Sequence, residues 1–316
     1  MSKSLRLLLV VVILAVVAFF VGNWYVAKQA KATIDEQLAA LNADPAAELV
    51  VSYENVSANI LTSSLEVSGL TIKHPEYGDF IIIDSVTSSN LWEMISGDVA
   101  LEGRSAMTGM RFSDNFFEAQ AAGMPAAPGT LDALKEVSID AYSDVSYEKG
   151  DDLFHVKMGI EDKQLVSLDF DIDVSNVRDA MYAIAEQQQQ GGGMMQPMEV
   201  EKFIDMLKDG VLHELTMRVA DHGLINAYLD MMAQQSGMKA DQMRDMMAMQ
   251  ISQMQPLDAT GNEALVGFIK GNNGLKLHWK PSQPMSFADI EQLGEENRPA
   301  SPEEAFELFG ISITAD

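Results

Sequence analysis

Three aspartates in the stretch LDFDIDV are the first candidates for chemistry. Asp169, Asp171 and Asp173 carry the carboxylate oxygens that bind calcium in proteins. A calcium loop of the EF-hand type needs Gly at its sixth position and Glu at its twelfth, where this sequence has Val174 and Ala180. Strict alternation with apolar residues is instead typical of the solvent-facing side of a β-strand. We therefore predict an acidic strand face without a metal site.

The remaining residue types that often carry catalysis form no recognisable motif. No two of the five histidines are four residues apart, and HExxH, GxSxG, GxGxxG and P-loop patterns are absent; the histidines are His74, His155, His213, His222 and His278. There is no cysteine, which excludes thiolate nucleophiles, thiolate metal sites and disulfides. The sequence therefore predicts a protein that is not an enzyme and holds no cofactor.

Methionine is unusually frequent. The chain has 21 methionines, and Met243 and Met247 belong to a stretch in which apolar residues recur at helical spacing. Such a helix packs into a core in most proteins, but flexible thioethers also suit a groove for a partner or a lipid. Thioethers can bind copper as well. Met243 and Met247 are included among the candidate groove residues.

The charge of the chain limits its partners. The formal net charge is −26, and 47% of the residues are apolar, as in a folded protein. So acidic a surface repels nucleic acid and anionic lipid headgroups. We therefore expect no nucleic-acid partner.

The N-terminal segment has the composition of a membrane helix. Residues 7–21 are uninterrupted Leu, Val, Ile, Ala and Phe, and basic residues precede them. We predict a single-pass signal anchor in a bacterial inner membrane, with the N-terminus cytoplasmic and the body periplasmic. A cleaved signal peptide is the alternative, because residues 30–32 read Ala-Lys-Ala. The proposed anchor residues are Leu7, Val12, Leu14, Phe19 and Trp24.

Changes of periodicity divide the rest of the chain. We predict a cytoplasmic tip and anchor at 1–25, a stalk helix at 26–46 and a β-rich domain at 47–184. A flexible linker at 185–197 and a mostly helical part at 198–316 follow. The predicted fold class is α+β: an N-terminal transmembrane helix, then an antiparallel, curved β-sheet covered by C-terminal helices.

The stretch SSLEVSGLTIKHPEYGDFIIIDSV, residues 63–86, predicts a hairpin. Gly69 interrupts its period-two pattern and indicates a bulge. Residues 137–147, 154–160 and 166–174 predict three more strands with one apolar face. The strand residues chosen as candidates for an apolar ligand groove are Leu65, Val67, Gly69, Leu70, Ile72, Phe170 and Ile172.

The pattern L-x-V-x-G-L-x-I, met by residues 65–72, resembles the opening module of AsmA-like and YdgA-like envelope proteins. The C-terminal stretch with Pro281 and Pro284 is similar in style to segments of such proteins. The resemblance implies a curved sheet whose apolar concave face shelters acyl chains. It offers no catalytic residues, and this chain is too short for a bridge between membranes.

Two functions follow as expectations. The first is a non-catalytic periplasmic protein, anchored in the inner membrane, that binds or handles phospholipid or another apolar ligand. The second is an accessory or scaffold protein of an envelope complex that acts through contacts with other envelope proteins. A continuous apolar cavity would favour the first, and a solid core with an exposed methionine patch would favour the second.

Overall fold

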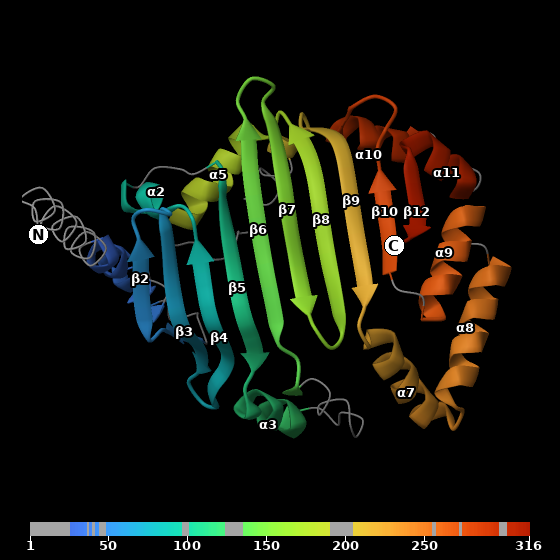
Figure 1. The fold of residues 1–316 in the computed structure, drawn as a ribbon, viewed down its shortest axis with the longest axis horizontal. Helices are drawn as coiled ribbons and strands as arrows, with labels where there is room; N and C mark the ends of the chain where they lie inside the picture. The colour runs from blue at the N-terminus through green and yellow to red at the C-terminus, as the bar shows by residue number, and fades with distance from the viewer. Residues whose placement is uncertain are drawn as a thin grey trace, which may run out of the picture.

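The fold, in a computed structural model, is built on one large antiparallel β-sheet (Figure 1). The structure describes residues 26–36, 38–39, 42–43, 49–96, 101–123, 135–189, 205–254, 257–271, 274–296 and 302–316. Within them the sheet has twelve strands, and its main path runs β1-β3-β4-β5-β6-β7-β8-β9-β10-β12. Strand β2 also pairs with β3, and β11 pairs with β9.

The strands follow the alternation of apolar and polar residues along the chain. Their bounds are β1 Val50–Ser52, β2 Asn55–Asn59, β3 Ser64–His74, β4 Gly78–Ser88, β5 Gly103–Phe112 and β6 Ile139–Glu148; then β7 Leu153–Asp162, β8 Val166–Ser175, β9 Val211–Asp221, β10 Gly274–Trp279, β11 Met285–Ser286 and β12 Ile311–Ala315.

The labelled helices lie between and beyond these strands. They are α2 Leu91–Ser96, α3 Asp114–Gly123, α5 Arg178–Gln189, α7 Leu224–Ser236, α8 Ala240–Met254, α9 Ala259–Ile269, α10 Phe287–Glu296 and α11 Pro302–Phe309. A further helix is described at residues 26–36. Helix α5 passes behind the upper ends of β5 and β6 in Figure 1, whereas α7 lies below the lower end of β9 and α8 and α9 lie beside β12.

A glycine changes the phase of one central strand. Met107 and Met110 lie three residues apart in β5, yet they pair with Ala141 and Ile139, which share a face of β6. Gly109 lies between them with φ 66, a conformation that favours glycine. The strand gains one residue here, so both methionines reach the same face.

Gly69 adopts the same backbone conformation with a different result. Its φ is 66, but β3 and β4 stay in register across it, with Ser68 opposite Ser85 and Leu70 opposite Ile83. The register of this pair shifts between Ile72 and Lys73 instead. The bulge predicted at Gly69 is therefore displaced toward the turn.

Two buried clusters hold the sheet to its helices. Near the β2 end, the helix at residues 26–36 contributes Val26 and Ala30 to a cluster with residues of β2, β3 and α2, namely Val56, Leu65 and Leu91. Near the upper ends of β7 and β8, Phe154, Val174 and Val177 are buried. Met181 of α5, Phe287 of α10 and Leu207 pack against them there.

The predicted fold class is wrong in two respects. First, within the described residues no helix has the length and apolarity needed to cross a membrane. The segment 1–25, with the proposed anchor residues Leu7, Val12, Leu14, Phe19 and Trp24, lies outside the described residues. Second, α7, α8 and α9 do not cover the sheet. Helix α7 lies below the lower end of β9, and α8 and α9 lie beside β12, where α9 contacts β10 and β12.

The predicted division of the body also needs correction. Residues 185–189 belong to α5 rather than to a linker, and residues 190–197 lie outside the described residues. The part after residue 198 contributes β9, β10, β11 and β12, which continue the same sheet. The physical reason is that these segments alternate apolar and polar residues, so they extend a sheet edge that would otherwise stay unpaired. The helix at 26–36 packs into a core cluster and is not a free stalk.

Candidate ligand-binding face

Cross-strand pairing aligns one apolar residue from each of nine strands, β3 to β10 and β12. Directly paired residues point to the same face of a sheet. The central row, as we name it, therefore lies on one face; its members are Val67, Val86, Met107, Ala141, Ile160, Leu168, Val219, Leu275 and Ala315. Eight inter-strand steps of ~4.8 Å give this row a length of about 38 Å.

None of the nine central-row residues is buried. Ile160 is 50% exposed, Ala315 is also exposed, and the other seven are half-buried. A sheet face of this width in a soluble protein is normally covered by a second layer. The central row is thus apolar surface that the described residues leave accessible.

The apolar rows between the central row and the upper ends of β7 and β8 become progressively more buried. The next row contains Met158, Phe170, Met217, Leu277 and Ile313, of which Met158 is 38% exposed. Two rows further up, Phe154 is 0% exposed and Leu212 is buried, because α5 and α10 pack against that end. One edge of the apolar face is therefore a core, and the central row is open.

The opposite face of the same strands is charged, and it accounts for the three aspartates. Asp169 accepts a hydrogen bond from the Tyr142 hydroxyl at 2.8 Å. Asp171 lies 3.6 Å from Lys157 Nζ, and Asp173 Oδ1 lies 2.6 Å from His155 Nδ1. Asp171 and Asp173 thus contact the neighbouring β7, and Asp169 reaches across it to β6. Within the described residues no group of His, Asp and Glu is arranged to hold a metal ion.

Charge pairing on this face shifts two pKa values. The hydrogen bond to Asp173 raises the pKa of His155 above its ordinary value, with burial acting against it and Glu148 adding to it. Hydrogen bonds from Lys280 and then His278 lower the pKa of Glu214. Both groups keep their charge over a wider pH range than they would in water. The polar face is therefore a set of cross-strand ion pairs.

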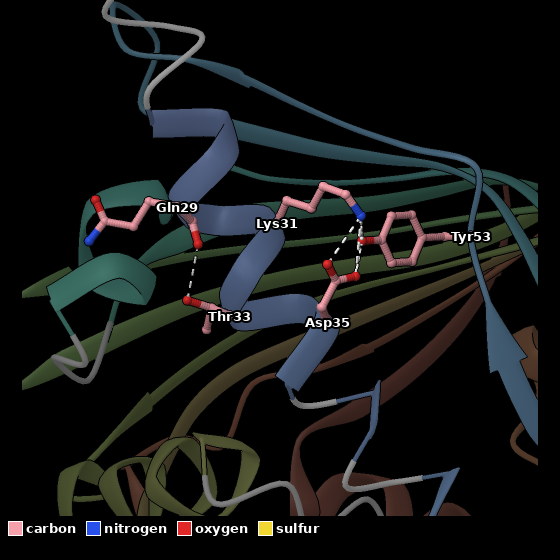
Figure 2. Close-up of polar contacts among 5 residues, drawn as sticks. All are labelled: Gln29, Lys31, Thr33, Asp35 and Tyr53. Carbon is pink, nitrogen blue, oxygen red and sulfur yellow. Dashed lines mark hydrogen bonds and ion pairs between the residues drawn. The ribbon is translucent and has the colours of Figure 1, made fainter.

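A polar contact locks the helix at 26–36 to the sheet (Figure 2). Lys31 Nζ lies 2.5 Å from the Tyr53 hydroxyl and 3.2 Å from Asp35, and Tyr53 donates to Asp35. These bonds lower the pKa of Asp35, first through Tyr53 and then through Lys31. Asn42 also makes two hydrogen bonds to the backbone of Val51, at 2.8 and 2.9 Å. These side chains are paired with one another or with the backbone of β1. The contacts therefore hold this N-terminal helical segment against the edge of the sheet.

The structure places the five groove candidates of the hairpin in different environments. Leu65 is buried in the cluster at the β2 end, whereas Val67 is in the central row. Leu70 and Ile72 pair with Ile83 and Ile81 of β4. Gly69 faces the side chain of Glu54, which leaves no room for a Cβ. Of the hairpin candidates, Val67 is therefore the one that the structure places in the central row.

The other four candidates are divided between the sheet and α8. Phe170 and Ile172 are half-buried on the apolar face and lie within two rows of the central row. Met243 is buried and Met247 is half-buried on α8, which packs against α7 and α9 beyond β12. The structure therefore does not bring Met243 and Met247 together with the hairpin.

Sequence reasoning missed the contribution of the last third of the chain. Met217, Val219, Leu275 and Leu277 continue the apolar rows in β9 and β10. The signal was present, since HELTMRVA and GLKLHWK alternate apolar and polar residues. The prediction of a mostly helical part at 198–316 does not use this signal, because the helices between the two stretches separate them in the sequence and their pairing is not a local pattern.

Comparison with known proteins gives family matches without a described activity. A family model described as "Uncharacterized protein" matches residues 159–316, half of the chain. A model described as "Bacterial protein of unknown function (DUF945)" matches residues 1–68. No curated protein and no solved structure matches. The predicted resemblance is supported at the level of a bacterial family of unknown function, since neither model is named AsmA-like or YdgA-like.

Proposed function

We propose that this chain, which belongs to the family whose model covers residues 159–316, is a non-catalytic binding protein for an apolar ligand such as a lipid acyl chain. The observation that carries the proposal is the central row, nine apolar residues on nine strands, none of which is buried. A row of about 38 Å is more than twice the ~15 Å depth of one leaflet of a bilayer core. One acyl chain fits along it with room to spare.

Burial of this surface supplies the driving force. Each apolar side chain that loses its remaining exposure gains about 25 cal/mol per Å² of area removed from water. The two most exposed side chains near the centre, Ile160 and Met158, lie on β7. They form the centre of the site, and methionine adapts to chains of different shape.

The site that we propose works in the bacterial cell envelope, on the periplasmic side of the inner membrane, with phospholipid as the ligand source. Support comes from the match of residues 1–68 to a bacterial family and from the net charge of −26. The charge opposes nucleic acid and adhesion of the body to an anionic bilayer. It does not oppose an uncharged acyl chain.

Photo-crosslinking of the full-length chain in cells tests this function. Cells fed a diazirine fatty acid are irradiated, and labelled peptides of the purified chain are mapped by mass spectrometry. We expect label on β7 and β8, and at least a tenfold loss in Ile160→Glu, because a charge in the central row repels an acyl chain.

The control places the same new charge on the other face of the sheet. Ser146 is exposed and pairs with His155 on the charged face. The variant Ser146→Glu should keep the label. Labelling that is absent from β5 to β9, or equal in Ile160→Glu and the unaltered chain, would refute the proposal.

A second candidate function is an accessory protein that acts through protein contacts. The observation that favours it is on α8, where Met246, Met249 and Met254 are 44%, 57% and 67% exposed. Exposed apolar side chains in a row mark interaction surfaces. A photo-reactive residue in place of Met249 should capture one envelope protein reproducibly, and the same residue at Asp151 should not. Equal capture at both positions would count against it.

A further inference from the structure

Residues of the β6–β7 turn and of the start of α5 line a polar pocket. The turn lies at the top of the sheet in Figure 1. Its volume is about 500 Å³. The residues that line it are Tyr147, Lys149, Asp152, Asn176, Arg178 and Asp179. Four of these six side chains are charged, in contrast to the rows below.

Tyr147 belongs to both the pocket and the apolar face. Its ring stacks on buried Phe154 with 4.5 Å between ring centroids, and it packs against the upper core cluster. Its hydroxyl donates to Asp152 at 2.7 Å. Tyr147 therefore joins the polar pocket to the buried upper core of the apolar face.

The two cations of the pocket are available to a ligand. The Arg178 guanidinium lies over the rings of Tyr147 and Tyr182, at 5.9 and 5.5 Å from their centroids. Within the described part of the chain, neither Arg178 nor Lys149 forms an ion pair with a carboxylate. Stacking on the aromatic rings and a hydrogen bond with Tyr182 fix the guanidinium, and its other N–H groups can bind a phosphate.

The two carboxylates of the pocket limit the kind of ligand that it can bind. Asp179 follows Arg178 at the start of α5 and is exposed, and Asp152 is half-buried. Two cations and two carboxylates make the lining electrically neutral. A simple anion would be attracted by the two cations and repelled by the two carboxylates. A ligand that carries both a positive and a negative charge would be attracted by both pairs of side chains.

We propose that this pocket binds the headgroup of a zwitterionic amphiphile, with its phosphate on Arg178 and Lys149 and its ammonium on Asp179. This inference rests on the proposed function, since the acyl chain of the amphiphile lies on the apolar face. The ligand class is thus a phosphoethanolamine-type lipid rather than a fatty acid or an apolar small molecule.

The dimensions agree with one acyl chain. Tyr147 and Ala141 lie on the same face of β6, Ala141 in the central row. Six residues of strand span about 20 Å, and one leaflet of a bilayer core is ~15 Å deep. A tail of that length, starting at the pocket, passes the partly covered rows and ends near the row of Met158, next to the central row.

The preference for a zwitterionic headgroup is measured by displacement of a bound fluorescent fatty acid from the full-length chain. The competitors are lysophosphatidylethanolamine, lysophosphatidic acid and a fatty alcohol of the same chain length, with O-phosphoethanolamine and inorganic phosphate as headgroup-only arms. We expect lysophosphatidylethanolamine to bind at least tenfold more tightly than the fatty alcohol, and severalfold more tightly than lysophosphatidic acid. The headgroup-only arms should bind weakly.

Two substitutions assign the effect to the pocket. Arg178→Gln and, separately, Lys149→Gln on its exposed turn should reduce the affinity for lysophosphatidylethanolamine and leave the affinity for the fatty alcohol unchanged. The matched control is Lys163→Gln, an exposed lysine in the turn at the opposite end of β7.

The outcomes separate the inference from the function on which it rests. Equal affinity for all three amphiphiles, or no effect of Arg178→Gln and Lys149→Gln, overturns the headgroup site and leaves the binding function standing. Inorganic phosphate that binds as tightly as the lipid overturns the inference in favour of a simple anion site. If no amphiphile and no fatty acid binds, the proposed function itself fails.

Discussion

Replacing Ile160 by Thr measures how much of the central row is open in solution. Full burial of an isoleucine side chain is worth about 1.5–3 kcal/mol relative to exposure. Ile160 keeps 50% of its surface in contact with water. Thr retains the β-branch that suits a strand, so the loss is confined to apolar area. We therefore expect Ile160→Thr to lower the free energy of unfolding by about 1 kcal/mol.

The comparison variant is Phe154→Ala, on the same strand and the same face. Phe154 is 0% exposed, and truncation of a buried phenylalanine costs about 3–5 kcal/mol. Urea unfolding of both variants, with the full-length chain and without added lipid, gives the two values. A loss of 3 kcal/mol or more for Ile160→Thr would show, by the same scale, that the central row is a filled core, and it would remove the basis of the proposed site.

Two further predictions concern the backbone and the charged face. Gly109 has φ 66 and a Cβ there would lie 2.2 Å from Asp84, so Gly109→Ala should destabilise the chain by more than about 1 kcal/mol, whereas Gly150→Ala, with nothing within 4 Å, should be near neutral. Urea midpoints of the two variants test this, and equal midpoints would contradict it. Because Asp173 raises the pKa of His155, this pair stabilises the fold fully below the unfolded value of about 6.5 and loses that effect as pH rises through the raised pKa. His155→Gln should then lower the urea midpoint at pH 5.5 and leave it unchanged at pH 9, and an equal loss at both would refute the assignment.

The two faces of the sheet suit different tasks. The charged face carries cross-strand pairs such as Lys157 with Asp171, and water can solvate what remains exposed. The apolar face carries the central row, which no described helix covers in the way that α5 covers Phe154. An antiparallel sheet can keep one face in water at little cost only if that face is polar. The open apolar row is the surface on which the proposed function places an acyl chain.

Local patterns in the sequence determined much of this chemistry. Alternation in residues 166–174 placed the aspartates on one face and Phe170 and Ile172 on the other, because a strand has a period of two. The strands at residues 63–86, 137–147, 154–160 and 166–174 were predicted for the same reason, whereas β5 was not predicted. The composition predicted an acidic surface, because charged side chains remain in water.

The tertiary structure decided which of these faces meet and which are covered. Val67 and Leu275 are more than two hundred residues apart, and pairing across seven inter-strand steps places them in one row. Such pairing depends on register between distant segments, and register is set by contacts that a local pattern does not contain. The same holds for Leu65 and Met243, which the sequence assigned to a groove and the fold buries in two separate helix contacts. Burial is a property of the packed chain, so the open row and the pocket beside Arg178 could be located only once every strand was in place.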